Sequence, residues 1–145
     1  MKLRILFLAL VLALTGPVLA QEDEETKKTP AMREKVYTLL SEAQAALEEE
    51  ENATVALEKL EQLQKMRDLN SYELAQMWTF YGYVYFQEEN FREAARAYEN
   101  VLAQDPPSAM EIQTLYALGQ LSFVIEDYDS AVKYLRRWFE EAENP

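Results

Sequence analysis

Apolar residues recur at spacings of three and four from residue 31 almost to the end of the chain, which is the spacing of amphipathic helices. Short polar segments interrupt this pattern, and no glycine lies between Gly16 and Gly82. The pattern predicts helices at 31–49, 54–67, 72–88, 91–104, 109–125 and 128–142. Thr29 and Pro30 suit the start of the first helix, because threonine can cap it and proline is tolerated in a first turn. The predicted fold class is therefore all-α.

The aromatic segment 77–86 (MWTFYGYVYF) is the one stretch whose composition also suits a buried strand. Its large residues Trp78, Tyr81 and Tyr85 nevertheless follow each other at spacings of three and four. The residues on both sides are strong helix formers, so we expect a helix here.

Three related turns divide the predicted helices into pairs. These turns are the segments 50–53 (EENA), 88–91 (EENF) and 125–128 (IEDY), offset by 38 and then 37 residues. In the central copy, Gly82 on the first helix and Ala94 on the second are the small residues that let the two helices cross closely. Gly119 falls on the position of Gly82 in the third copy, and Gln44 occupies it in the first. The chain therefore contains an internal repeat of helix pairs, with a degenerate first copy.

The central copy, residues 75–108, resembles the tetratricopeptide repeat, a helix–turn–helix unit of about 34 residues. The resemblance implies an α-solenoid of about three repeats, at about 37–70, 75–108 and 112–145, wound as a right-handed superhelix. It also implies a set of residues that pack the repeats together. These residues are Trp78, Tyr81, Gly82, Tyr85, Ala94, Tyr98, Gly119 and Ala131.

The offsets between copies exceed the length of the repeat, and we expect the additional residues in the links 70–74 and 107–111. Each link carries the pattern of a capping box, in which a short polar side chain and a glutamate three residues later bond each other's backbone amides. The two predicted boxes are Asn70 with Glu73 and Ser108 with Glu111.

In tetratricopeptide arrays the first helix of each repeat lines a concave surface where partners bind, and the resemblance transfers this role by position. The predicted partner-binding residues are Gln76, Thr79, Tyr83, Phe86, Gln87, Gln113, Tyr116, Gln120 and Phe123, with Thr38, Ser41, Ala45 and Glu48 in the first copy. Aromatic rings offer contact area and amides pair with an extended backbone, which favours a peptide ligand. The alternative is that Tyr83 and Tyr116 merely cover the seams between repeats.

The first twenty residues have the layout of a secretory signal peptide. Lys2 and Arg4 precede the apolar run 5–14, and the segment closes with Val18-Leu19-Ala20. The alternative is an uncleaved membrane anchor, but the run is much shorter than the ~20 residues that a span needs. No cysteine follows the run, which excludes a bacterial lipoprotein. The sequence predicts cleavage after Ala20, a disordered acidic leader at 21–30 and a location in the periplasm of a Gram-negative bacterium.

Charge and composition exclude several classes of function. The formal net charge is −12, which disfavours nucleic acids and anionic lipid surfaces as partners. The chain has no cysteine and no histidine, so thiol nucleophiles, Ser-His triads and the common metal sites are absent. The acidic run 48–51 lacks the spaced ligands of a calcium loop and is interpreted as a solvated turn. We expect no enzyme activity, no metal and no cofactor.

The last predicted helix leaves Leu135, Trp138 and Phe139 without a following helix to pack on. Either this face mediates self-association or the chain is the first part of a longer array. We expect one of these two states.

Two segments, 69–104 and 114–139, resemble a narrower group, the periplasmic tetratricopeptide proteins associated with TonB energy-transduction systems. The resemblance implies an accessory that contacts TonB or its inner-membrane motor and aids uptake across the outer membrane. Two alternatives stay open, namely a scaffold for envelope or outer-membrane assembly and a helper subunit of a cell-wall enzyme.

Overall fold

The computed structural model describes residues 31–48 and 52–142, which form six α-helices and no strand. The helices are α1 (Glu34–Glu48), α2 (Ala53–Gln64), α3 (Ser71–Gln87), α4 (Phe91–Leu102), α5 (Ser108–Val124) and α6 (Tyr128–Ala142). All six predicted helices are present, and the aromatic segment 77–86 is helical. The predicted signal peptide, the acidic leader and the Thr29-Pro30 start lie outside the described residues, as does most of the acidic run 48–51.

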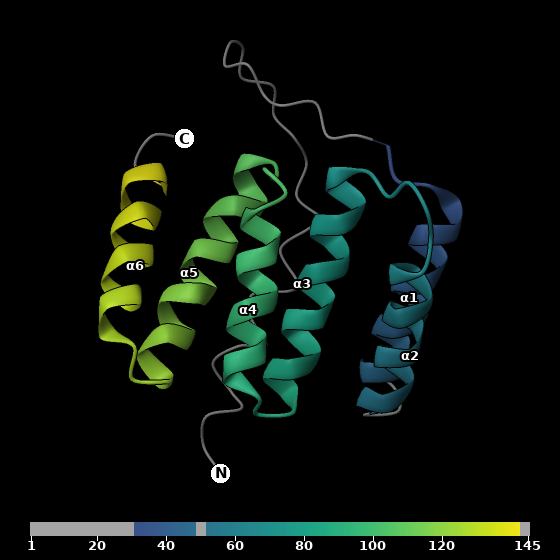
Figure 1. The fold of residues 1–145 in the computed structure, drawn as a ribbon, viewed down its shortest axis with the longest axis horizontal. Helices are drawn as coiled ribbons and strands as arrows, with labels where there is room; N and C mark the ends of the chain where they lie inside the picture. Colours follow the sequence, from purple (N-terminus) through teal and green to yellow (C-terminus); the bar gives the residue numbers. More distant parts are fainter. Residues whose placement is uncertain (1–30, 49–51, 143–145) are drawn as a thin grey trace.

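The helices associate as three pairs, α1 with α2, α3 with α4 and α5 with α6, and each pair packs on the next (Figure 1). The pairs stand side by side in one row, with α1 and α2 at one end and α6 at the other. This arrangement is an α-solenoid, and the predicted fold class is confirmed.

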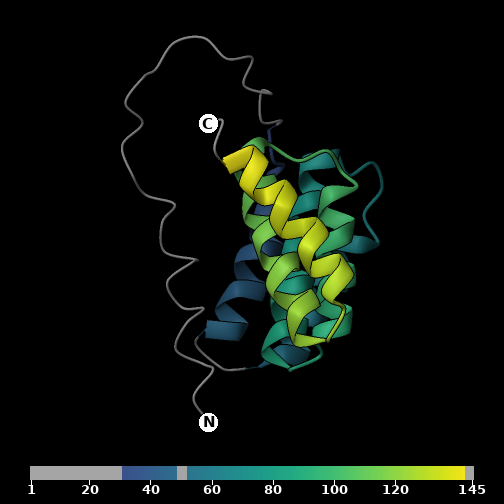
Figure 2. The ribbon, with the colours of Figure 1, turned by 90° about the vertical axis from the view of Figure 1, so that its left-hand side faces the viewer.

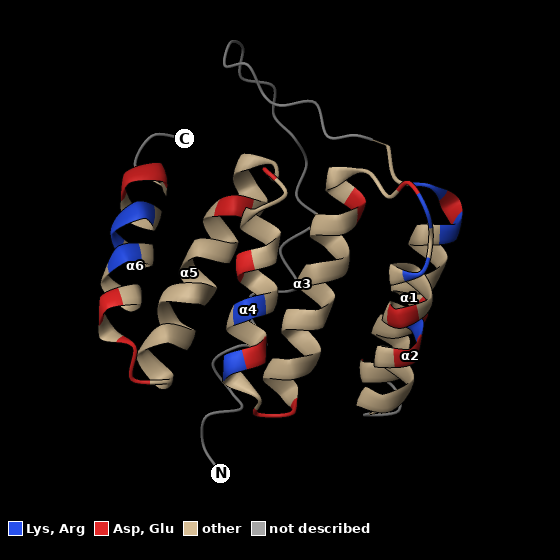
Figure 3. Cartoon of the chain, in the orientation of Figure 1, with Lys and Arg blue, Asp and Glu red and all other residues tan. Residues whose placement is uncertain are grey.

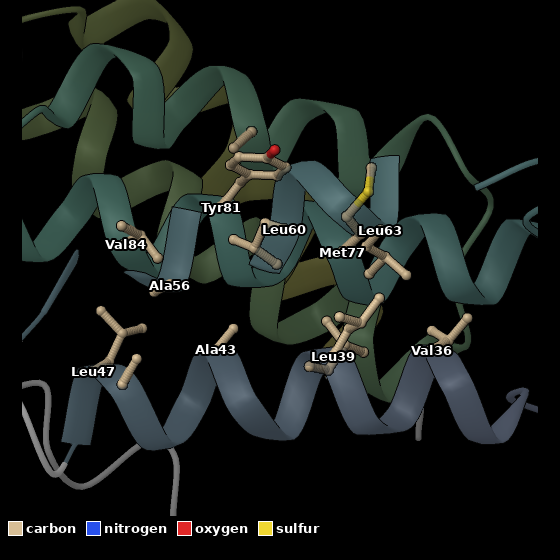
Figure 4. Packing of buried hydrophobic residues seen from close by; sticks show 13 residues of the cluster. Val36, Leu39, Ala43, Leu47, Ala56, Leu60, Leu63, Met77, Tyr81 and Val84 are labelled. Carbon is tan, nitrogen blue, oxygen red and sulfur yellow. The ribbon is translucent and has the colours of Figure 1, made fainter. Parts of the chain in front are cut away.

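The first repeat closes onto the second through an apolar cluster shared by α1, α2 and α3 (Figure 4). Side chains of α1 point from one side toward those of α2 and α3. The labelled members are Val36, Leu39, Ala43 and Leu47 of α1, Ala56, Leu60 and Leu63 of α2, and Met77, Tyr81 and Val84 of α3. Each buried leucine contributes roughly 1.5–3 kcal/mol to stability, so this cluster fixes the position of α3.

The two glycines of the described chain stand at the crossing of a helix pair. A Cβ atom built on Gly82 would lie 2.8 Å from the ring of Tyr98, and one built on Gly119 would lie 2.5 Å from the side chain of Leu135. Both pairs join the first helix of a repeat to its second helix, and the same register recurs in both repeats. The absence of a side chain at these positions therefore allows the close approach of α3 to α4 and of α5 to α6.

One predicted capping box is present and the other is wrong. The Asn70 side chain accepts from the Glu73 amide, and the Glu73 carboxylate accepts from the Asn70 amide at 3.0 Å. Helix α5 instead begins after Pro107, whose extended backbone makes it the N-cap, and Ser108 is already helical. Because Ser108 lies inside the first turn, its side chain caps nothing, and Glu111 pairs with Arg137 instead.

The additional residues of each repeat are also not where the sequence placed them. Residues 71–74 and 108–111 form the first turns of α3 and α5, which are 17 residues long each. The Asn70 box and Pro107 start these helices about one turn earlier than the repeat pattern indicates. The links between repeats are residues 65–70 and 103–107.

The turn within each of the last two repeats ends its helix with a left-handed residue. Glu89 has φ 58° and Glu126 has φ 64°. The amide of Asn90 donates to Tyr85 O, and that of Asp127 donates to Ser122 O. This bonding is the Schellman motif, and it turns the chain directly into α4 and α6. Within the described ranges, no helix is both long enough and apolar enough to cross a membrane.

Candidate peptide-binding surface

Helices α3 and α5 carry almost no charge. Glu73 is the only ionisable acidic or basic residue of α3, and Glu111 is the only one of α5. Figure 3 shows these two helices almost wholly uncharged between charged positions on α1, α4 and α6. Both carboxylates already have partners, because Glu73 pairs with Arg33 and Glu111 with Arg137. The predicted binding positions on α3 and α5 therefore offer neutral side chains and no unpaired charge.

Glu73 is buried and holds the start of α1 against the start of α3. Its carboxylate accepts hydrogen bonds from Arg33 Nη2 at 2.7 Å, from the Arg33 amide at 3.0 Å and from the Asn70 amide at 3.0 Å. These bonds, chiefly those from the Arg33 side chain, lower the pKa of Glu73 to about 2 although burial opposes the shift. Local sequence patterns identified Glu73 as a cap but not Arg33, which lies forty residues away in the chain.

The predicted residues of α3 bond mainly within their own helix. Thr79 Oγ1 donates to Ala75 O at 2.9 Å, Gln76 Nε2 donates to the Tyr72 hydroxyl at 2.9 Å, and Gln87 Nε2 donates to the Tyr83 hydroxyl at 2.8 Å. Each bond joins residues four apart, so these side chains lie along the helix surface. An extended peptide can replace such bonds without leaving a buried group unpaired.

Tyr83 also packs, half-buried, against the cluster of α1, α2 and α3. It therefore helps to cover the seam between the first two repeats, which is the alternative role that the sequence left open for this residue. Its hydroxyl nevertheless meets the exposed Gln87 side chain. Tyr83 has one apolar side toward the seam and one polar end at the surface.

The predicted residues of α5 divide into two groups. Tyr116 lies against Trp138 of α6, with ring centroids 5.1 Å apart, so it packs within its own repeat and not at a seam. Phe123 is 64% exposed and meets Tyr128, the first residue of α6, edge-on at 5.6 Å. Gln113 is exposed and Gln120 is half-buried. Phe123 therefore lies at the end of the molecule that α6 forms, beside the first residue of that helix.

Gln120 is chemically the most unusual residue of this surface. Its Oε1 atom is buried and accepts no hydrogen bond from any residue that the structure describes. Leaving a buried acceptor unpaired costs about 1–3 kcal/mol, so such an atom favours an added donor. Sequence position placed Gln120 on the binding surface, but nothing local indicated that its oxygen would lack a partner.

The predicted binding residues of α3 and those of α5 lie on helices whose backbones do not contact each other. No Cα atom of α3 lies within 8 Å of one in α5, and α5 packs on α4 instead. Figure 1 shows α4 between the two helices. The side chains of Tyr85 and Phe86 on α3 nevertheless pack against the apolar cluster that contains Leu115, Leu118 and Leu121 of α5, so the two helices share one cluster although their backbones lie apart.

The predicted residues of the first repeat lie on α1. The Thr38 hydroxyl donates to Glu34 O at 3.0 Å, and Ser41 and Ala45 are half-buried. Glu48 is exposed and accepts from Gln44 Nε2 at 2.9 Å. Among these four predicted binding residues of the first repeat, Glu48 is the only charged one.

Of the predicted packing residues, Trp78, Tyr81, Tyr85, Ala94 and Tyr98 belong to or pack against the two apolar clusters. On α3, Trp78 and Tyr81 have ring centroids 5.3 Å apart, and Tyr81 and Tyr85 have centroids 6.0 Å apart. Ala94 and Ala131 are buried in the second helices of their repeats, and Tyr98 covers Gly82. Within the ranges described, no group of three potential ligand residues could hold a metal ion.

The family follows from comparison with known proteins. The family model described as "Tetratricopeptide repeat" matches residues 40–109 and 82–144, which together span most of the chain. The chain belongs to this family, whose repeats serve as protein-interaction scaffolds. Comparisons with curated proteins and with solved structures gave no match.

Proposed function

We propose that this protein is a non-catalytic adaptor that binds an extended, uncharged peptide segment of a partner protein along α3 and α5. The observation that carries the proposal is the buried, unpartnered Oε1 of Gln120 on a surface of aromatic and amide side chains. Gln120 as a whole is half-buried, so a turn of its side chain toward the surface would let this oxygen accept from a backbone amide of a bound peptide.

The charge distribution supports the same ligand. Since Glu73 and Glu111 are both paired with arginines, neither is available to bind a basic side chain or a peptide amino terminus. Contact with rings such as Phe86 and with the glutamines suits neutral, apolar or amide-containing residues.

We further propose that the adaptor works in the periplasm as an accessory of a TonB-type uptake system. The charged start and apolar run of residues 1–20 support export, and the resemblance of segments 69–104 and 114–139 supports the TonB association. This role is consistent with a binding surface and with the strongly acidic composition.

In-cell photocrosslinking tests both proposals. A photoreactive residue replaces Gln87 or Gln113, which are exposed on α3 and α5, and the captured proteins are identified by mass spectrometry. Thr54, exposed on α2, is the control position. Capture of TonB or a motor component from both test positions, but not from Thr54, would support binding and role together. Capture of an assembly factor or a cell-wall enzyme would keep the surface and replace the role, and equal capture from Thr54 would reject the surface.

Gln120 provides a sharper test of the ligand. Replacement by methionine, which has a similar shape and no buried oxygen, should weaken binding of the captured peptide about tenfold or more. The same change should stabilise the free protein by about 1 kcal/mol, because it removes an unpaired acceptor. Gln62→Met, the same substitution at an exposed position of α2, is the matched control. Calorimetric titration and urea unfolding measure the two effects, and a Gln120→Met variant with unchanged affinity would contradict the proposed contact.

A further inference from the structure

One side of α6, bordering its contact with α5, carries an apolar stripe that is partly exposed. Its members are Tyr128, Val132, Leu135 and Phe139, which are 55%, 56%, 37% and 54% exposed. Spacings of four, three and four residues place them on one side of the helix. α6 packs on α5 alone, and no other described element covers its outer side (Figure 2). Phe123 and Val124 at the end of α5 are also exposed and extend the stripe.

The exposed area is large for a single surface. A buried aromatic side chain covers about 150–250 Å², so three half-exposed aromatics and three aliphatic residues leave on the order of 500 Å² of apolar surface in water. That is at the upper end for the largest patch on a monomer and approaches the ~800 Å² per partner of a stable interface.

The stripe is also symmetric along the helix. Because its spacings of four, three and four are the same in both directions, a two-fold axis between Val132 and Leu135 superposes the stripe on itself. Two antiparallel copies of α6 would then place Tyr128 opposite Phe139 and Val132 opposite Leu135, twice each. A two-fold interface requires this kind of self-complementary surface.

The charges beside the stripe fit the same axis. Asp129 and Arg136 are seven residues apart and therefore lie on the same edge of the stripe. Under the two-fold rotation, Arg136 of one copy comes within about 3 Å, measured along the helix, of Asp129 in the other. Each dimer thus gains two pairs of opposite charges at its rim, whereas in a parallel two-fold pair this edge of each helix would face the other edge of its partner and these pairs would not form.

From the stripe, its symmetry and its flanking charges we infer that the protein forms a two-fold dimer through antiparallel packing of α6 against α6 of a second copy. The interface shares Phe123 with the predicted binding residues of α5 but includes none of those of α3, so the dimer presents two copies of the α3 surface. The proposed function and the dimer are therefore tested separately, because the protein can lose peptide binding at α3 and stay a dimer, or become a monomer and still bind the peptide there.

The test measures the mass of the protein in solution. Protein purified from cells that express the full chain should be a dimer by light scattering at about 10–100 µM. Val132→Glu places a carboxylate beside the axis and should make the protein a monomer. Tyr37→Glu alters a 65% exposed aromatic residue on α1 and should leave the dimer intact. A monomeric wild-type protein, or a dimer that survives Val132→Glu, would overturn the inference.

A charge swap tests the antiparallel register. Arg136→Asp and Asp129→Arg should each raise the dissociation constant of the dimer about tenfold, because each replaces two attractive pairs by two repulsive ones. The double variant restores the pairs and should return the constant to within about threefold of wild type. Circular dichroism verifies that each variant is folded. A double variant as weak as the single ones would overturn the register.

Discussion

Gly82 shows how much a single residue decides in this fold. The position looks like an ordinary site on α3, but a Cβ atom there would lie 2.8 Å from the ring of Tyr98. Real Cβ atoms do not approach a ring this closely, so α3 and α4 can keep their separation only with glycine here. Gly119 meets Leu135 in the same way, and the two sites therefore have the same structural role.

Gly82→Leu should lower the free energy of unfolding by about 1–3 kcal/mol or more, because the added side chain displaces the Tyr98 ring. Thermal and urea unfolding measure the change. A second substitution, Tyr98→Ala in the Gly82→Leu background, makes room and should recover part of the loss. If Gly82→Leu unfolds like the wild type, the crossing of α3 and α4 described above is wrong.

Glu73 gives the fold a dependence on acidity. Its pKa in the folded protein is about 2 and its ordinary value is 4.5, so its contribution is complete above pH 4.5 and is lost as the pH falls toward 2. Arg33 is 42% exposed, and water screens the pair. We therefore expect the contribution to be about 1–2 kcal/mol, less than the full shift would give.

Urea unfolding of wild type and Glu73→Gln between about pH 2 and pH 7 measures this contribution. The wild type should be more stable at neutral pH, and the difference should shrink as the pH falls. Glu61→Gln, which alters an exposed carboxylate on α2, is the control and should show little difference at any pH. A gap between wild type and Glu73→Gln that is independent of pH would show that the pKa of Glu73 is the same in the folded and unfolded states, which would contradict the lowered pKa.

At the scale of a helix, α3 and α5 have equal lengths but start in different ways. The first turn of α3 is capped by reciprocal bonds between Asn70 and Glu73. The first turn of α5 has no side-chain cap, since Pro107 precedes it and Glu111 turns toward Arg137. Two sequence patterns that looked equivalent thus have different structures, because Asn70 stands at the N-cap position of α3 whereas Pro107, and not Ser108, stands at that of α5.

This difference predicts unequal effects of two similar substitutions. Asn70→Ala should lower the free energy of unfolding by about 1 kcal/mol or more, because it leaves the Glu73 amide without its acceptor. Ser108→Ala should change it by less than about 0.5 kcal/mol, since the Ser108 side chain makes no cap. Denaturant unfolding of both variants measures the contrast. Equal losses would mean that α5 also has a serine cap.

The whole molecule separates charge from its predicted binding surface. Charged residues lie on α1, α2, α4 and α6, while α3 and α5 hold one paired carboxylate each (Figure 3). The strongly acidic composition therefore describes the molecule as a whole and not the surface that we expect to bind a partner.

Peptide binding should consequently depend little on salt. Raising the salt concentration from about 50 mM to about 500 mM screens exposed charges strongly but should change the affinity of the captured peptide by less than about twofold. Fluorescence anisotropy at several salt concentrations measures this dependence. A fall of tenfold or more would indicate that charged residues outside α3 and α5 bind the peptide.

The sequence alone determined the six helices, the pairing of helices into repeats and the equivalence of Gly82 and Gly119. These features depend on spacings within a few turns of helix, and neighbouring residues specify them. Only the tertiary structure decided that Glu73 meets Arg33, that Glu111 leaves its predicted cap for Arg137, that Gln120 has a buried oxygen without a donor, and that the stripe on α6 is exposed. Each of these depends on which groups from distant parts of the chain arrive at one place, and local periodicity carries no information about that.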